Sequence, residues 1–158
     1  ASTIGTCTSS GAWYGGRTGK LGASLYLNGS SEYIAVGNIG TSATAISFWI
    51  KPDSTTQSII ELSSGNSVAI SSGTVSVTGF GTPTIYVNGS RSTTITGTNW
   101  HHLTIVSSAD IPANTVNIGK VSSSYYAGQI DDVKIFNYTL TAEQVKTLYN
   151  NGAVSFTD

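Results

Sequence analysis

Two adjacent carboxylates, Asp131 and Asp132, are the side chains of this sequence whose type and spacing best suit chemistry. They lie in the run QIDDVKIF, which has the composition of a strand. Successive strand side chains point to opposite faces, so one carboxylate is expected on a buried face, where it needs a partner. A calcium ion, a network of backbone and hydroxyl hydrogen bonds, and a Lys or Arg side chain all remain open as that partner.

The other candidate catalytic groups do not form a constellation, and we expect no catalytic residues. Apart from the adjacent pair, none of the eight acidic residues has another acid within four positions. His101 and His102 are neighbours on a predicted strand, which sends them to opposite faces and excludes a chelating pair. Serine is so frequent that no Ser-His-Asp spacing stands out.

Four aromatic residues in predicted loops are candidates for ligand binding. Sugar C–H groups pack on aromatic rings, and planar polar groups bond the hydroxyls. Trp13 and Tyr14 occupy a Gly-rich N-terminal segment, and Tyr125 and Tyr126 precede the carboxylate strand. Within each pair we expect one ring to pack on the core and the other to reach the surface.

Composition narrows the range of partners. Charged residues make up 9% of the 158, with net charge −1, against 24 Ser, 22 Thr and 18 Gly. No basic surface is therefore available for nucleic acid or for anionic lipid, and no apolar run approaches the roughly 20 residues of a membrane span. The uncharged polar surface favours an extracellular or cell-surface protein.

Short alternating runs between turn residues predict an all-β chain organised as one domain over residues 1–158. Asn28-Gly29 and Asn88-Gly89 have the composition of hairpin turns. One helix is expected near 142–150, with Thr141 and Gln144 forming a capping box and Leu140 and Val145 a hydrophobic staple. The predicted strands are 24–29, 33–37, 45–52, 58–62, 67–71, 74–77, 84–89, 92–96, 101–106, 115–119 and 129–136.

Several phrases occur in an order that resembles a laminin G-like domain of the concanavalin A-like lectin/glucanase superfamily. They are GKLGASLYLNGSSEYIAVG, AISFWIKP, TIYVNG, NWHHLTIV and GQIDDVKIFNYTLTAEQVKTLYNNG. The resemblance implies a jelly-roll β-sandwich of two antiparallel sheets with one short C-terminal helix. It also implies a binding or adhesion module within a larger extracellular protein. The Glu-x-Asp-x-x-Glu signature of the superfamily's glucanases is absent from this sequence.

The resemblance further implies a structural calcium ion at the sandwich rim. Asp131 would bind it together with the turn that supplies Asn28, Gly29 and Glu32, although many relatives have Asp where this chain has Asn28. The predicted function is a non-catalytic module that binds a glycan or a surface-protein ligand. The alternative is a structural or protein-interaction sandwich with no sugar site.

Overall fold

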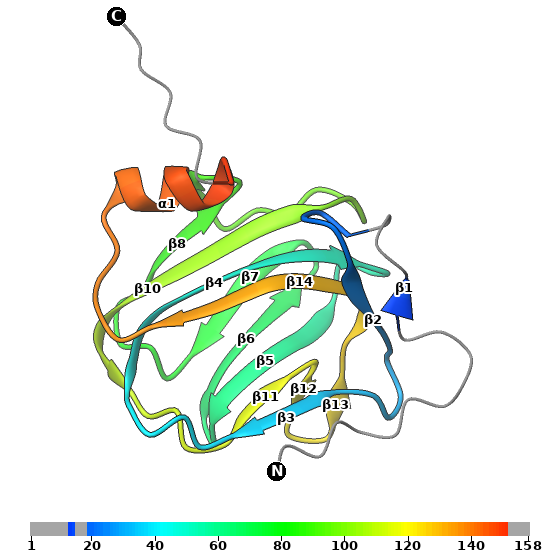
Figure 1. Ribbon diagram of the computed structural model, residues 1–158, viewed down its shortest axis with the longest axis horizontal. Helices are drawn as coiled ribbons and strands as arrows, with labels where there is room; N and C mark the ends of the chain where they lie inside the picture. The colour runs from blue at the N-terminus through cyan, green and yellow to red at the C-terminus, as the bar shows by residue number, and fades with distance from the viewer. Residues whose placement is uncertain (1–12, 15–18, 152–158) are drawn as a thin grey trace, which may run out of the picture.

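The computed structural model describes residues 13–14 and 19–151, and its strands form two main antiparallel sheets (Figure 1). The seven-stranded sheet has the order β1-β2-β14-β4-β10-β8-β9, and the five-stranded sheet has the order β3-β11-β5-β6-β7. The predicted all-β sandwich is therefore confirmed. The first sheet comprises β1 (Trp13–Tyr14), β2 (Ser24–Asn28), β4 (Ala43–Pro52), β8 (Thr84–Val87), β9 (Ser90–Arg91), β10 (His101–Ile111) and β14 (Ala127–Phe136).

The second sheet and a separate two-stranded hairpin complete the β structure. The sheet comprises β3 (Ile34–Gly37), β5 (Gln57–Ser63), β6 (Asn66–Ser71), β7 (Thr74–Thr78) and β11 (Val116–Ile118). The hairpin consists of β12 (Lys120–Val121) and β13 (Ser124–Tyr125). It follows β11 directly and lies at the β3 end of the five-stranded sheet (Figure 1).

The main core lies between the two sheets and explains the alternation of the central strand β4. Ile46, Phe48 and Ile50 are fully buried in this core, whereas Ser47 and Trp49 alternate with them on the opposite face. Ser47 and Trp49 are nevertheless at most 2% exposed. The outer face of the seven-stranded sheet must therefore be covered at this point.

The helix α1 (Ala142–Tyr149) provides part of that cover, as its apolar residues predict. Thr141 caps it, its hydroxyl accepts from the Gln144 backbone N–H, and the Gln144 side chain accepts from the Thr141 N–H, which confirms the capping box. Figure 1 shows α1 beside β8 and β10. A second apolar cluster joins the helix to this sheet through Ala45, Tyr86, Val106, Phe136, Leu140, Val145 and Leu148.

The Asn88-Gly89 turn joins β8 to β9 as the sequence predicts. Asn88 has φ 52° and Gly89 has φ 77°, the left-handed values that a type I′ turn requires. A Cβ on Gly89 would lie 3.0 Å from the ring of Tyr149, so the turn also fits closely against the last residue of α1.

Two sequence predictions about local structure are wrong. Residues 92–96 form no strand and contribute only an isolated bridge between Thr94 and Thr74, because Ile95 alone among them is buried. Asn28-Gly29 is not a hairpin turn, since β2 and β3 belong to different sheets. The Asn28 side chain instead organises a wider turn between the two sheets.

Candidate functional site

A β-bulge places both carboxylates of β14 on the outer face of the seven-stranded sheet. Asp131 pairs with Trp49 and Lys134 pairs with Ser47, so β14 takes three steps where β4 takes two. Asp132 is at the bulge and has φ 49°. Core packing of Ile130 before the bulge and of Val133 after it leaves both acids on the opposite side. The expectation that one acid lies on the buried face is therefore wrong.

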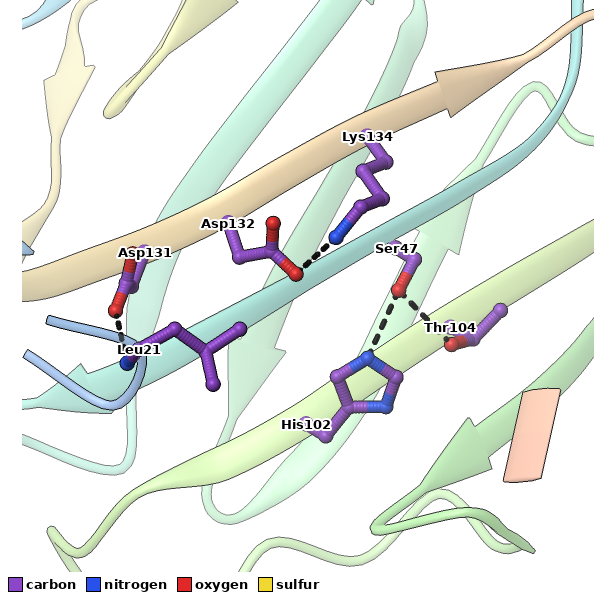
Figure 2. Close-up of polar contacts among 7 residues, drawn as sticks. All are labelled: Leu21, Ser47, His102, Thr104, Asp131, Asp132 and Lys134. Carbon is purple, nitrogen blue, oxygen red and sulfur yellow. Dashed lines mark hydrogen bonds and ion pairs between the residues drawn. The ribbon is translucent and has the colours of Figure 1, made fainter. Parts of the chain in front are cut away.

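Ordinary protein groups satisfy both carboxylates. Figure 2 shows Asp132 directed toward Lys134, with which it forms an ion pair, and Asp131 directed toward Leu21. The Leu21 backbone N–H donates to Asp131 Oδ2 over 2.8 Å. The Lys134 and Asp132 side chains are 40% and 25% exposed, so their ion pair contributes little to stability.

The four predicted calcium ligands do not come together. Asn28 pairs with Ala127, and Asp131 lies four residue steps further along β14, which is roughly 13 Å along the strand. The Gly29 N–H donates to the Tyr126 carbonyl, and Glu32 Oε2 accepts from the Asn28 N–H over 3.0 Å. Asn28 Oδ1 in turn accepts from the backbone N–H groups of Ser30, Ser31 and Glu32.

These contacts mean that the predicted residues do not fit one calcium ion. The turn at 28–32 satisfies its own polar groups, and Asp131 bonds a different loop. Among the residues that the structure describes, no three His, Cys, Asp or Glu side chains are grouped to hold a metal.

A buried Ser–His pair lies on the same face of the sheet, beneath α1. His102 Nε2 is 2.9 Å from Ser47 Oγ, and the Thr104 hydroxyl donates to Ser47 Oγ over 3.4 Å (Figure 2). Burial lowers the pKa of His102 to about 4, although the negative charge of Asp132 opposes the shift. The Tyr149 ring lies 5.9 Å from the His102 ring, and Trp49 lies 4.9 Å from it.

This pair is structural. A serine nucleophile must reach its substrate, and its histidine must be oriented by a third group. Ser47 and His102 are each 1% exposed, and within the described part of the chain His102 Nδ1 has no hydrogen-bond partner. His101 is also buried, so both histidines are packing residues of β10.

The two candidate tyrosines of the 125–126 segment have different environments. Tyr126 is 0% exposed, its hydroxyl donates to the Gln129 carbonyl over 3.1 Å, and burial raises its pKa far above the ordinary value. Tyr126 is thus a core residue whose ring offers no face to a ligand. Tyr125, on β13, is only partly buried.

Tyr125 forms an aromatic corner with Tyr33, the residue that precedes β3. The two ring centroids are 6.0 Å apart and the ring planes meet at 61°. Lys120 pairs with Tyr125 across the β12–β13 hairpin, and its Nζ lies 4.5 Å from the Tyr33 centroid and 5.3 Å from that of Tyr125. We call Tyr33, Tyr125 and Lys120 the aromatic corner.

The backbone at Gly119 brings the hairpin to this position. Gly119 has φ 85°, and a Cβ there would collide with the Leu27 side chain. Its N–H donates to the Ile59 carbonyl over 2.7 Å, which fixes the start of β12 against β5. The corner is therefore carried by a short hairpin that is anchored to the five-stranded sheet.

Polar side chains lie next to the corner on the outer face of the five-stranded sheet. Glu61 and Asn117 are direct cross-strand neighbours on β5 and β11, and both are partly exposed. Ile60 and Ile118 beside them belong to the core, so the polar pair faces outward. Glu61 Oε2 accepts from the Ser122 N–H in the hairpin turn over 3.5 Å, which places the carboxylate beside the hairpin.

Trp13 and Tyr14, the remaining candidates, form β1, whose backbone pairs with Leu25 and Ser24 of β2. Their side chains lie outside the described part of the structure. Their predicted role in binding a ligand stays a prediction.

Comparison with known families finds a similarity over part of the chain. Residues 73–146 match a laminin G family model described as the concanavalin A-like lectin/glucanases superfamily. The match confirms the resemblance to a laminin G-like domain. Laminin G-like domains are generally non-catalytic binding modules and are typically extracellular. No curated protein matches the chain.

The matched stretch covers the strands from β7 to β14 and the first half of α1. It includes Lys120 and Tyr125 but not Tyr33 or Glu61. Among the described residues, no helix is long and apolar enough to cross a bilayer.

Sequence reasoning found Tyr125 but missed Lys120 and the three residues from other strands that lie near it. Tyr33 and Glu61 lie within predicted strands, where the alternation places them outward but does not show that they meet the 125 segment. For Asn117, too, the alternation gives the face of the strand but not the neighbours in space. The missing signal was the strand order, because only the neighbouring positions of β3, β11 and β5 bring these residues together.

Proposed function

We propose that this chain is a non-catalytic carbohydrate-binding module of an extracellular or cell-surface protein, with its binding surface at the aromatic corner. The observation that carries the proposal is the pair of partly exposed tyrosine rings, 6.0 Å apart, with Glu61 and Asn117 beside them. Aromatic faces pack on the C–H groups of a sugar, and amide and carboxylate oxygens accept from its hydroxyls. The corner supplies both kinds of contact.

The rest of the molecule supports this assignment. The outer face of the seven-stranded sheet is partly covered by α1, and the histidine on it is buried beneath the Tyr149 ring. The five-stranded sheet presents short polar side chains outward, such as Ser67, Ser76 and Thr78. A polar surface with aromatic rings at one end suits a sugar chain better than it suits a hydrophobic protein partner.

The test is a glycan array followed by calorimetry on the sugars that bind. Tyr125→Leu is expected to weaken binding by on the order of tenfold, because a ring face and its hydroxyl are both lost. Tyr138→Leu is the matched control, since Tyr138 is 53% exposed but lies beside Phe136, on the connection to α1.

A blank array for the wild-type chain would overturn the proposal. Binding that survives both Tyr125→Leu and Tyr33→Leu would place the sugar elsewhere on the molecule. A blank array together with saturable binding to a purified cell-surface protein would support the alternative, a protein-interaction sandwich.

A further inference from the structure

The Lys120 ammonium lies against both rings of the aromatic corner. Its Nζ lies over both tyrosine rings, 4.5 Å and 5.3 Å from their centroids. Within the described residues, the ion pair identified is the one between Lys134 and Asp132, so Lys120 is held there without a carboxylate contact. The two rings therefore bind a cation that the chain itself provides.

The surroundings favour positive charge. The faces of aromatic rings carry negative electrostatic potential and attract a cation that lies over them. The carboxylate of Glu61 lies next to the same hairpin, bonded to the Ser122 N–H. An anionic sugar would meet both the rings and this carboxylate unfavourably.

We propose, on the basis of the function assigned above, that the aromatic corner takes a sugar bearing a protonated amino group, whose ammonium replaces that of Lys120. Lysine is suited to leave, because its stem is flexible and solvent readily hydrates its ammonium. The sugar ring then packs on Tyr125, and Glu61 and Asn117 accept from its ammonium and hydroxyls. Lys120 thus acts as an internal competitor that excludes weakly binding cations.

The experiment compares three β-1,4-linked glucose-type oligosaccharides of equal length that differ only at C2. They carry an ammonium, an N-acetyl group or a hydroxyl, and calorimetry is run at pH 5.5 on the complete chain. The ammonium sugar is expected to bind about fivefold or more tightly than either neutral sugar. Added salt should weaken the binding of the ammonium sugar alone.

Three variants separate the contributions of the corner. Lys120→Ala is expected to tighten binding of the ammonium sugar about two- to fivefold, the equivalent of one lost cation–π competitor, and to leave neutral sugars unchanged. Glu61→Gln should weaken binding of the ammonium sugar only. Lys146→Ala, at an exposed position of α1, removes an equal charge as the control.

The outcomes distinguish this inference from the proposed function. Equal affinity for the three sugars, or weaker binding of the ammonium sugar after Lys120→Ala, overturns the inference. The carbohydrate module stays in place if Tyr125→Leu still weakens binding of all three sugars. If the chain instead prefers a uronate-containing sugar and loses that preference in Lys120→Ala, the ligand is anionic and the inference is overturned. Absence of binding to any sugar, here and on the array, overturns both.

Discussion

The buried His102 ring makes the stability of the fold depend on pH. His102 is 1% exposed, bonded to Ser47 Oγ and covered by the rings of Trp49 and Tyr149. Asp132 and Lys134 on β14 are the charges that act on it, the first raising and the second lowering its pKa. Burial prevails, and the pKa falls from the ordinary 6.5 to about 4. The folded chain therefore keeps this ring neutral where the unfolded chain protonates it.

The sign and size of the effect follow from proton linkage. Between pH 6.5 and pH 4 the unfolded state binds more protons, so the free energy of unfolding falls as the pH falls through this window. With the two pKa values above, the loss attributable to His102 is about 2 kcal/mol between pH 8 and pH 5. Below pH 4 this contribution levels off.

The assay is urea denaturation of the wild type and of His102→Gln at intervals from pH 8 to pH 5. Glutamine keeps a polar group near Ser47 without titrating, so the variant should lose about 2 kcal/mol less than the wild type over this range. His101→Gln is the comparison, because burial also lowers the pKa of His101. If His102→Gln shows the same pH dependence as the wild type, the buried ring is not the source and the reasoning fails.

Three further predictions concern stability. Thr141→Ala removes the N-cap of α1 and should cost about 1 kcal/mol in urea denaturation, whereas Thr141→Ser should cost little. Gly89→Ala should destabilise the fold by roughly 1–3 kcal/mol through strained φ and contact with Tyr149, and Gly97→Ala, with similar φ but open space, should cost less. Treatment with a calcium chelator should leave the Tm unchanged. A Tm that drops on chelation and recovers on adding calcium would contradict the conclusion that Asp131 and the 28–32 turn do not bind one calcium ion.

Periodicity and family resemblance predicted most of the fold because most strands bury one face. β4, β5, β6 and β7 fall close to their predicted ranges, whereas β10 extends to Ile111, beyond the predicted 101–106. In β4 the alternation of Ile46, Phe48 and Ile50 explains the agreement. The helix was predictable from the local capping chemistry of Thr141. Strands of two residues, such as β12 and β13, contain too few positions to show any alternation.

The candidate site was only partly predictable, for two physical reasons. A bulge is a single inserted residue with no distinctive composition, so Asp132 was expected to follow the strand alternation. The aromatic corner is built from segments brought together by strand order, and the sequence indicates Tyr125 but not its partner Tyr33. Tyr125 and Tyr126 could not be separated until the hairpin placed one ring outside and one inside.

The bulge in β14 also bears on how relatives of this chain should be aligned. Between Asp131 and Lys134, β14 contains one residue more than the paired segment of β4. Val133 and Ile135, which follow the extra residue, still pack on the core. A homologue with a regular strand there would match only across a one-residue gap at position 132. A shortened chain lacking that single residue would keep the same side chains inside, making this position the natural place for length variation within the strand.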